Sequence, residues 1–201
     1  MSAYVVKVTS ADATTSRQRW SHYFAVLFAL GGLIIGINLR DAALNATTLY
    51  VNTEAGIRAE YPSGWLIDSV GDYVFRVRDM SQSGFKTTIQ VATQPVSASA
   101  TTRNIVDSLS LSRSQVLSSY TVYSIQPFTL PGQEEEALAV RYTYVAAEAN
   151  PFLQSIPFVV EGIDILTIRR GQVIVITFNA DSREYGQQSA IFNRFLESLE
   201  I

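Results

Sequence analysis

The sequence contains no cysteine and a single histidine, His22. The absence of cysteine excludes disulfide bonds, thiol catalysis, thiolate-bound iron–sulfur clusters and c-type haem attachment. His22 lies at the edge of the longest apolar run, so a Ser-His-Asp triad or a histidine-based zinc site cannot form inside the folded domain. We therefore expect no catalytic residues, no bound cofactor and no metal.

The sequence also lacks an excess of basic residues. Charged residues make up 16% of the chain and the formal net charge is −3. The three bases Lys7, Arg17 and Arg19 lie near the N-terminus, whereas the part after Asp41 is acidic. An acidic domain is repelled by phosphate backbones and anionic lipid surfaces, which argues against nucleic acid as a partner.

One apolar run is present, HYFAVLFALGGLIIGINLR at 22–40, and it carries no charge from Tyr23 to Leu39. A helix rises about 1.5 Å per residue, so about 20 such residues cross a hydrocarbon core of about 30 Å. Trp20 and Tyr23 suit the interface at one end of such a span. The predicted organisation is a polar tail, a transmembrane helix, a linker and an exported domain, at 1–19, 20–40, 41–47 and 48–201.

The charges around the run predict its orientation. Three bases precede it and only Arg40 closely follows it, so the positive-inside rule places the tail in the cytoplasm and the domain in the periplasm. The expected location is therefore the cell (inner) membrane, with a single pass. A signal peptide cleaved after Ala46 is the alternative, but the run exceeds the usual apolar length of about 7 to 15 residues.

Small residues inside the run suggest a helix–helix contact. Gly32 and Gly36 fall on one helix face, with Gly31 beside them. Such spacing lets the backbone of another helix approach closely. We predict that these glycines pack against another helix.

The remainder of the chain shows strand patterns rich in Tyr, Phe, Val, Ile and Thr, at 72–80, 85–96, 120–130, 136–148, 159–170 and 172–180. Short connections, of which RRGQ (169–172) is the clearest hairpin turn, favour an antiparallel sheet. Helical spacing predicts helices within 101–119, capped by Thr101 or Thr102, and within 186–201. We therefore predict an α+β domain with helices packed on an antiparallel sheet.

The order of these elements resembles a known family. EYPSGW (60–65) follows a short strand pair, and a helix and long strands come after it; ILTIRRGQVIVITFNAD (165–181) then leads into a terminal helix ending in FLESLEI. This layout resembles the PsbP/Mog1-like family over about residues 48–201. The resemblance implies an αβα sandwich whose members bind protein partners, in photosystem oxygen-evolving machinery or in GTPase regulation. No partner site of the family is carried over, because only the structural signature matches.

The YPSGW segment itself is expected to serve the core. Pro62 fixes a turn, Gly64 permits an unusual backbone angle, and Tyr61 and Trp65 supply large apolar area. Core packing is therefore favoured over ligand binding there.

The clusters of charged residues do not have the patterns of metal or catalytic sites. The acidic run 134–136 is interpreted as a solvated turn, because consecutive carboxylates in a turn rarely converge on one calcium ion. Asp68 and Asp72 lie near Gly71 without further ligands. Arg76 and Arg78 have the spacing of one strand face and are expected on the solvent side of the sheet.

Two segments are predicted to contact partners. ANPFLQSIPF (149–158) is too apolar for a simple connection, so it either covers the core or docks on a neighbour. Its candidate contacts are Pro151, Phe152, Leu153, Pro157 and Phe158. The second segment is the hairpin turn, where Arg169 and Arg170 could clamp a carboxylate or phosphate of a partner.

These features together favour a non-catalytic, single-span accessory subunit of a larger membrane complex. The architecture resembles small subunits of bacterial respiratory or photosynthetic electron-transfer complexes such as alternative complex III. The expected partners are other subunits and the lipid bilayer. Two alternatives remain: an anchored binding module with a well-formed pocket, and an anchored enzyme with carboxylates converging in a cleft.

Overall fold

The computed structural model describes residues 16–132, 136–147 and 156–201, which fall into two compact units divided after Ala46. The first unit contains helix α1 (Ser16–Leu44). Its segment Arg19–Leu44 is long and apolar enough to cross a membrane, and none of its apolar window is buried. The second unit, Thr47–Ile201, is called the C-terminal domain below.

Helix α1 is longer than the predicted span 20–40, since it continues through the first part of the expected linker to Leu44. The sequence DAAL favours helix, because alanine and leucine have high helix propensity. The backbone N–H and the side-chain amide of Asn45 both donate to the carbonyl of Asp41, at 3.0 and 2.8 Å, and close the last turn.

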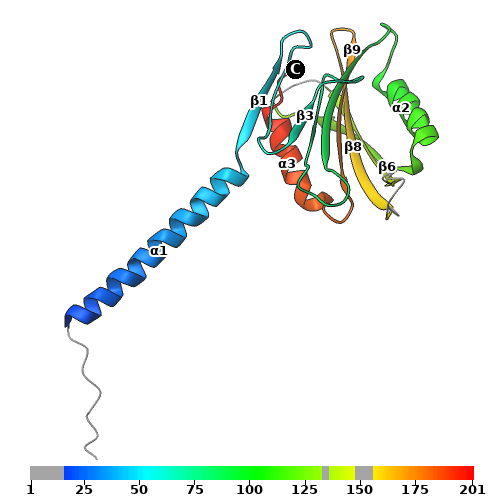
Figure 1. The fold of residues 1–201 in the computed structure, drawn as a ribbon. Coiled ribbons are helices and arrows are strands. Elements are labelled where there is room, and N and C mark those ends of the chain that lie inside the picture. The colour runs from blue at the N-terminus through cyan, green and yellow to red at the C-terminus, as the bar shows by residue number, and fades with distance from the viewer. Residues whose placement is uncertain (1–15, 133–135, 148–155) are drawn as a thin grey trace, which may run out of the picture. The chain divides into compact units, whose positions relative to one another are not determined.

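The C-terminal domain contains two antiparallel sheets (Figure 1). The smaller sheet pairs β1 (Thr47–Asn52) with β2 (Ile57–Pro62). The larger has seven strands in the order β3-β4-β5-β9-β8-β7-β6. Their bounds are β3 (Leu66–Asp68), β4 (Phe75–Arg78), β5 (Thr88–Pro95), β6 (Ser118–Thr129), β7 (Glu136–Ala146), β8 (Phe158–Arg169) and β9 (Gln172–Asp181).

Two helices cover opposite faces of the larger sheet. Helix α2 (Thr102–Val116) packs on β6, β7 and β8, and α3 (Tyr185–Ser198) packs on β9 and β2 (Figure 1). Alternate residues of a strand point to opposite faces. On β9, Ile176 and Phe178 join the core on the α3 side, whereas Val173 and Val175 join the core on the α2 side. The predicted αβα arrangement around an antiparallel sheet is therefore confirmed.

Two local sequence signals, the helix cap at Thr101 and the turn RRGQ, correctly predicted where α2 begins and where β8 turns into β9. The side chain of Thr101 accepts a bond of 3.3 Å from the N–H of Asn104 and caps α2. The predicted RRGQ turn joins β8 to β9, with positive φ at Arg170 (50°) and Gly171 (76°). Both central residues of a type I′ hairpin turn adopt this left-handed region, which explains the tight connection.

The YPSGW segment enters the α3-side core as expected. Tyr61 and Trp65 are buried there, and the N–H of Trp65 donates to the carbonyl of Pro62 at 3.0 Å to close the turn. The expectation for Gly64 is wrong, because its φ is not positive and the turn forms without the left-handed region. Gly56, one connection earlier, has φ of 66° and carries that role in the β1–β2 turn.

A buried ion pair holds α2 on its face of the sheet. Arg113 of α2 donates through Nη1 to Oδ2 of Asp164, which lies on β8 with 1% of its side chain exposed. Thr177 Oγ1 donates to Oδ1 of Asp164 at 2.7 Å, and the hydroxyl of Tyr142 lies 3.4 Å from the same oxygen. The Arg113 guanidinium also lies over the Tyr142 ring, 4.8 Å from its centroid. Burial raises the pKa of Asp164, and the charge of Arg113 opposes that rise.

We expect Arg113→Ala to lower the free energy of unfolding by about 3 kcal/mol, because it leaves a buried carboxylate without its cation. Guanidinium denaturation of the full chain in detergent measures the change. Arg103→Ala is the matched control on α2, because Arg103 forms only an exposed pair with Asp107 at 3.5 Å. Its expected cost is below about 0.5 kcal/mol. Equal losses for the two variants would contradict the assigned role of Arg113.

Candidate functional site

Polar side chains cross the larger sheet in two neighbouring rows on the α2 face. Strand register fixes the order in each row, because paired residues on adjacent strands share a face. The first row follows the register pairs through Asp68, Arg76, Gln90, Thr177 and Asp164. The second row follows them through Arg78, Thr88, Asn179, Gly162 and Tyr142. The opposite face of the same strands is apolar, with Phe75 and Val77 fully buried.

Helix α2 covers only part of this polar face. It packs on β6, β7 and β8, so the rows end beneath it at the Arg113–Asp164 pair. On β3 and β4 the row ends stay partly exposed: 30% of the Arg76 side chain, 35% of Arg78 and 24% of Asp68. We call the part formed by Asp68, Arg76, Arg78, Thr88 and Gln90 the open half of the polar face.

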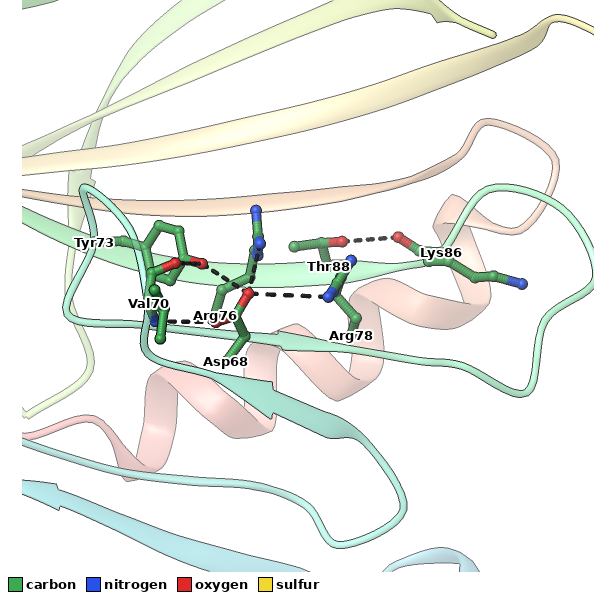
Figure 2. A network of polar contacts seen from close by, with 7 residues as sticks. All are labelled: Asp68, Val70, Tyr73, Arg76, Arg78, Lys86 and Thr88. Atoms are coloured by element: carbon green, nitrogen blue, oxygen red, sulfur yellow. Dashed lines mark hydrogen bonds and ion pairs between the residues drawn. The ribbon is translucent and has the colours of Figure 1, made fainter. Parts of the chain in front are cut away.

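Asp68 is the centre of the contacts in the open half (Figure 2). Its Oδ2 accepts hydrogen bonds from Arg76 Nη2 at 2.7 Å and from the Tyr73 hydroxyl at 2.8 Å, and it lies 3.9 Å from Arg78 Nη2. Its Oδ1 accepts the N–H of Val70 at 3.0 Å. The bond from Val70, followed by those from Arg76 and Tyr73, lowers the pKa of Asp68 to about 2.

The two arginines differ in how their donors are used. The guanidinium of Arg76 lies over the ring of Tyr73, 4.6 Å from its centroid, and is hydrogen-bonded to Asp68. Arg78 has only the 3.9 Å ion pair, which is longer than a hydrogen bond. The Nε atoms of both arginines are enclosed and meet no acceptor in the described part of the chain. One carboxylate therefore faces two guanidinium groups, and the open half carries excess positive charge.

Lys86 extends the basic side chains along the same region (Figure 2). Its ammonium group donates to the carbonyl of Gln82, and its own carbonyl accepts the Thr88 hydroxyl at 2.8 Å. The two arginines can bind an anion, but neither they nor Asp68 are well suited to proton transfer. A guanidinium keeps its proton, and a carboxyl with a pKa of about 2 is a weak base.

A pocket of about 380 Å³ lies at the β4–β5 connection. The Nε2 atom of Gln82, which lines it, is enclosed and has no acceptor among the described residues. Asp181 also lines it, and its carboxylate is bound by Arg183 at 2.6 Å. The lining residues are Ser81, Gln82, Ser83, Gly84, Phe85, Phe158, Asp181, Arg183 and Glu184. Within the chain that the structure describes, no group of three or more metal-ligating side chains is placed to hold an ion.

The predicted partner contacts fall in separate places. Phe158 begins β8, is half-buried and lines the pocket, and Pro157 beside it is exposed. Arg169 and Arg170 lie at the other end of β8, where Arg170 is exposed. A strand rises about 3.3 Å per residue, so the length of β8 separates the two sets. Pro151, Phe152 and Leu153 lie outside the described residues, and docking by this segment stays a prediction.

The predicted helix-packing glycines lie in α1. A Cβ atom added to Gly31, Gly32 or Gly36 would meet nothing within 4 Å. Their faces are therefore open to approach by another helix, and the contact itself stays a prediction.

The sequence did not reveal the network around Asp68. The spacing of Arg76 and Arg78 correctly placed both on one strand face, away from the α3-side core. They were expected on the solvent side of the sheet, and their side chains are partly exposed there, but the expectation did not include their contact with Asp68. That contact depends on the β3–β4 register, which pairs Asp68 with Arg76. Asp72 lies in the connection between these strands and is exposed. No short motif in the sequence specifies this pairing.

The lowered pKa of Asp68 predicts how its contribution to stability depends on pH. A carboxyl whose pKa falls from 3.8 to about 2 on folding stabilises the folded state fully above pH about 4. That contribution is lost as the pH falls through about 2. We therefore expect the difference in unfolding free energy between wild type and Asp68→Asn to be constant above pH about 4 and to shrink below it. Urea denaturation across this range measures it, with Asp72→Asn as the exposed control. A difference that stays flat down to pH 2 would contradict the network.

Comparisons with known proteins identify the fold. No protein-family model and no curated protein sequence matches the chain. The solution structure of cyanobacterial PsbP (CyanoP) from Synechocystis sp. PCC 6803 matches with a TM-score of 0.58 and 12% identity, over 78% of this chain and 92% of that one. Protein PA94 of unknown function from Pseudomonas aeruginosa, a putative regulator, matches with a TM-score of 0.51 and 12% identity, over 78% and 98%.

A third solved structure agrees with these two. LpqN, involved in cell envelope biogenesis of Mycobacterium tuberculosis, matches with a TM-score of 0.50 and 13% identity, over 77% of this chain and 89% of that one. Identities this low show the fold alone. The C-terminal domain therefore has the PsbP/Mog1-like fold that the sequence resemblance implied.

Proposed function

We propose that the protein is a non-catalytic, single-span accessory subunit of a multi-subunit membrane complex. The observation that carries the proposal is α1, a helix of membrane-spanning length with no buried residue in its apolar window, followed by a PsbP/Mog1-like domain. The helix would anchor the chain and pack on other helices, and the domain would bind a neighbouring subunit. In this proposal the tail is cytoplasmic and the domain periplasmic, as the positive-inside rule requires.

The face of α1 that would meet another helix is made of small residues. Ala25, Ala29, Gly32 and Gly36 recur at intervals of three or four, so they lie on one side of the helix. The open space at both glycines would allow a second helix to come close. This arrangement supports assembly within the membrane over a helix that only anchors the domain.

The polar face of the C-terminal domain supports a binding role over a catalytic one. Asp164 is enclosed and bound by Arg113, so it is not accessible to a substrate. Asp68, the carboxylate of the open half, has a pKa of about 2 and is engaged by Arg76. We further propose that the complex is a respiratory or photosynthetic electron-transfer assembly of the alternative complex III kind, in which this chain has a structural role.

A second candidate function is an independent anchored module that binds a ligand outside the cytoplasm. The pocket beside Phe85 and Phe158 favours it, because its volume of about 380 Å³ falls in the range of small-molecule sites. Its lining is largely polar, with Gln82 and Asp181 among the side chains, so a small polar ligand would suit it. This candidate predicts that the chain is recovered alone from its membrane.

Gentle solubilisation of the native membrane, followed by native gel electrophoresis and mass spectrometry of the affinity-purified chain, tests the proposal. We expect recovery in a fixed ratio with other membrane subunits. Gly36→Leu should reduce that recovery several-fold, because a larger side chain keeps a packed helix at a distance. Ile34→Phe is the control for Gly36→Leu. It also enlarges a side chain of α1, but at a position about 200° round the helix from Gly36. Recovery of wild type as a monomer or simple dimer would overturn the proposal.

A further inference from the structure

We propose that the open half of the polar face binds an acidic segment of a protein partner, and that Arg78 is its main carboxylate contact. The inference rests on the proposed function, because it names the chemistry of the surface that the neighbouring subunit would present. It rests on three observations: Arg76 is hydrogen-bonded to Asp68 whereas Arg78 is not, the Asp68 carboxylate already lies between the two arginines, and neutral polar side chains lie beside them.

Arg78 has the hydrogen-bonding capacity that such a contact requires. A guanidinium carries five N–H donors in a planar fork that matches a carboxylate. No hydrogen bond is made by that group to the described residues, and its one ion pair is 3.9 Å long. Its side chain is 35% exposed, so a partner can reach it.

The groups around Arg78 are held by contacts within the domain. Arg76 is fixed by its 2.7 Å bond to Asp68 and by the ring of Tyr73. Asp68 is itself fixed by Tyr73 and by the N–H of Val70. The row beside Arg78 continues with Thr88, whose hydroxyl donates to the carbonyl of Lys86. Binding on a surface ordered in this way loses little conformational entropy.

The contact between Asp68 and the two arginines indicates that the site suits a carboxylate. Oδ2 of Asp68 already lies between the two guanidinium groups, so these arginines bind a carboxylate oxygen in the structure. One carboxylate cannot neutralise two arginines, and a second would complete the charge balance. The net charge of the chain is −3, so a short acidic segment that meets only the open half suits the site better than a long polyanion such as a nucleic acid. Beside the arginines, the Thr88 hydroxyl oxygen can still accept a hydrogen bond and the Gln90 amide can donate or accept one, which suits the polar groups of a peptide.

The test uses the full chain in nanodiscs of zwitterionic phosphatidylcholine, with fluorescence anisotropy of a short labelled oligoglutamate peptide. We expect saturable binding that weakens as salt is raised. Arg78→Gln should weaken it about tenfold or more, because the variant loses both the charge and the fork. Arg78→Lys should recover only part of the affinity, since an ammonium group keeps the charge without the fork.

Arg103→Gln is the matched control, because it removes the same charge from an exposed site on α2. It should leave the affinity unchanged. The temperature of unfolding of Arg78→Gln should lie close to that of wild type, because the Arg78 guanidinium makes only a 3.9 Å ion pair and no internal hydrogen bond. An affinity of Arg78→Gln equal to wild type would overturn the inference. So would an equal loss in Arg103→Gln, which would indicate a general charge effect, and so would Arg78-dependent binding of phosphatidylglycerol vesicles in place of the peptide.

Failure of this inference differs from failure of the proposed function. If wild type leaves its native membrane with other subunits and Arg78→Gln leaves with them equally well, the complex stands and the assigned contact is wrong. If wild type is recovered alone, the proposed function is wrong whatever the peptide shows. Loss of co-recovery in Arg78→Gln and of peptide binding together, with Arg103→Gln intact in both, supports the inference.

Discussion

The enclosed charge of Asp164 constrains the rest of the C-terminal domain. Only 1% of its side chain is exposed. Burying a carboxylate in this way costs roughly several kcal/mol of folding free energy unless a cation and hydrogen bonds accompany it. Arg113 supplies the cation from α2, and Thr177 supplies a hydroxyl from β9. Helix α2 is therefore fixed over β6, β7 and β8 by a polar contact as well as by its smaller apolar core.

The position of α2 determines which part of the sheet remains available. The polar rows begin under α2 at Asp164 and Tyr142 and continue across β9 and β5 to Arg76 and Arg78. Charge is balanced under the helix, where one arginine meets one aspartate. At the uncovered end two arginines share Asp68. The same face is thus structural where α2 lies on it and suited to recognition where it does not.

The two units have different roles in the proposed function: α1 is the membrane span and the C-terminal domain is the binding surface. Helix α1 has the length, composition and exposed small residues expected for a span that packs on other helices. In the C-terminal domain, Tyr61 and Trp65 pack with Phe192 and Phe195 of α3 in one core, on the face of the larger sheet opposite the polar rows. In the proposed role, a polar face backed by this core would suit contact with a neighbouring subunit, because little order must be gained on binding.

The sequence alone determined the elements, since each depends on local patterns. Alternation predicted the long strands, RRGQ predicted the turn between β8 and β9, and Thr101 marked the start of α2. The apolar run predicted the long helix, although its end at Leu44 came from helix propensity beyond the apolar residues. Absence of cysteine and the single histidine excluded whole classes of chemistry without any structure.

Only the tertiary structure decided which charged residues meet. Arg113 and Asp164 are 51 positions apart, and no local pattern relates them. Asp68 and Arg76 are close in sequence, but their contact requires the register of β3 on β4, which pairs the two residues on one face. Local periodicity reports which face a side chain takes. The neighbour that it meets there depends on how distant strands and helices come together.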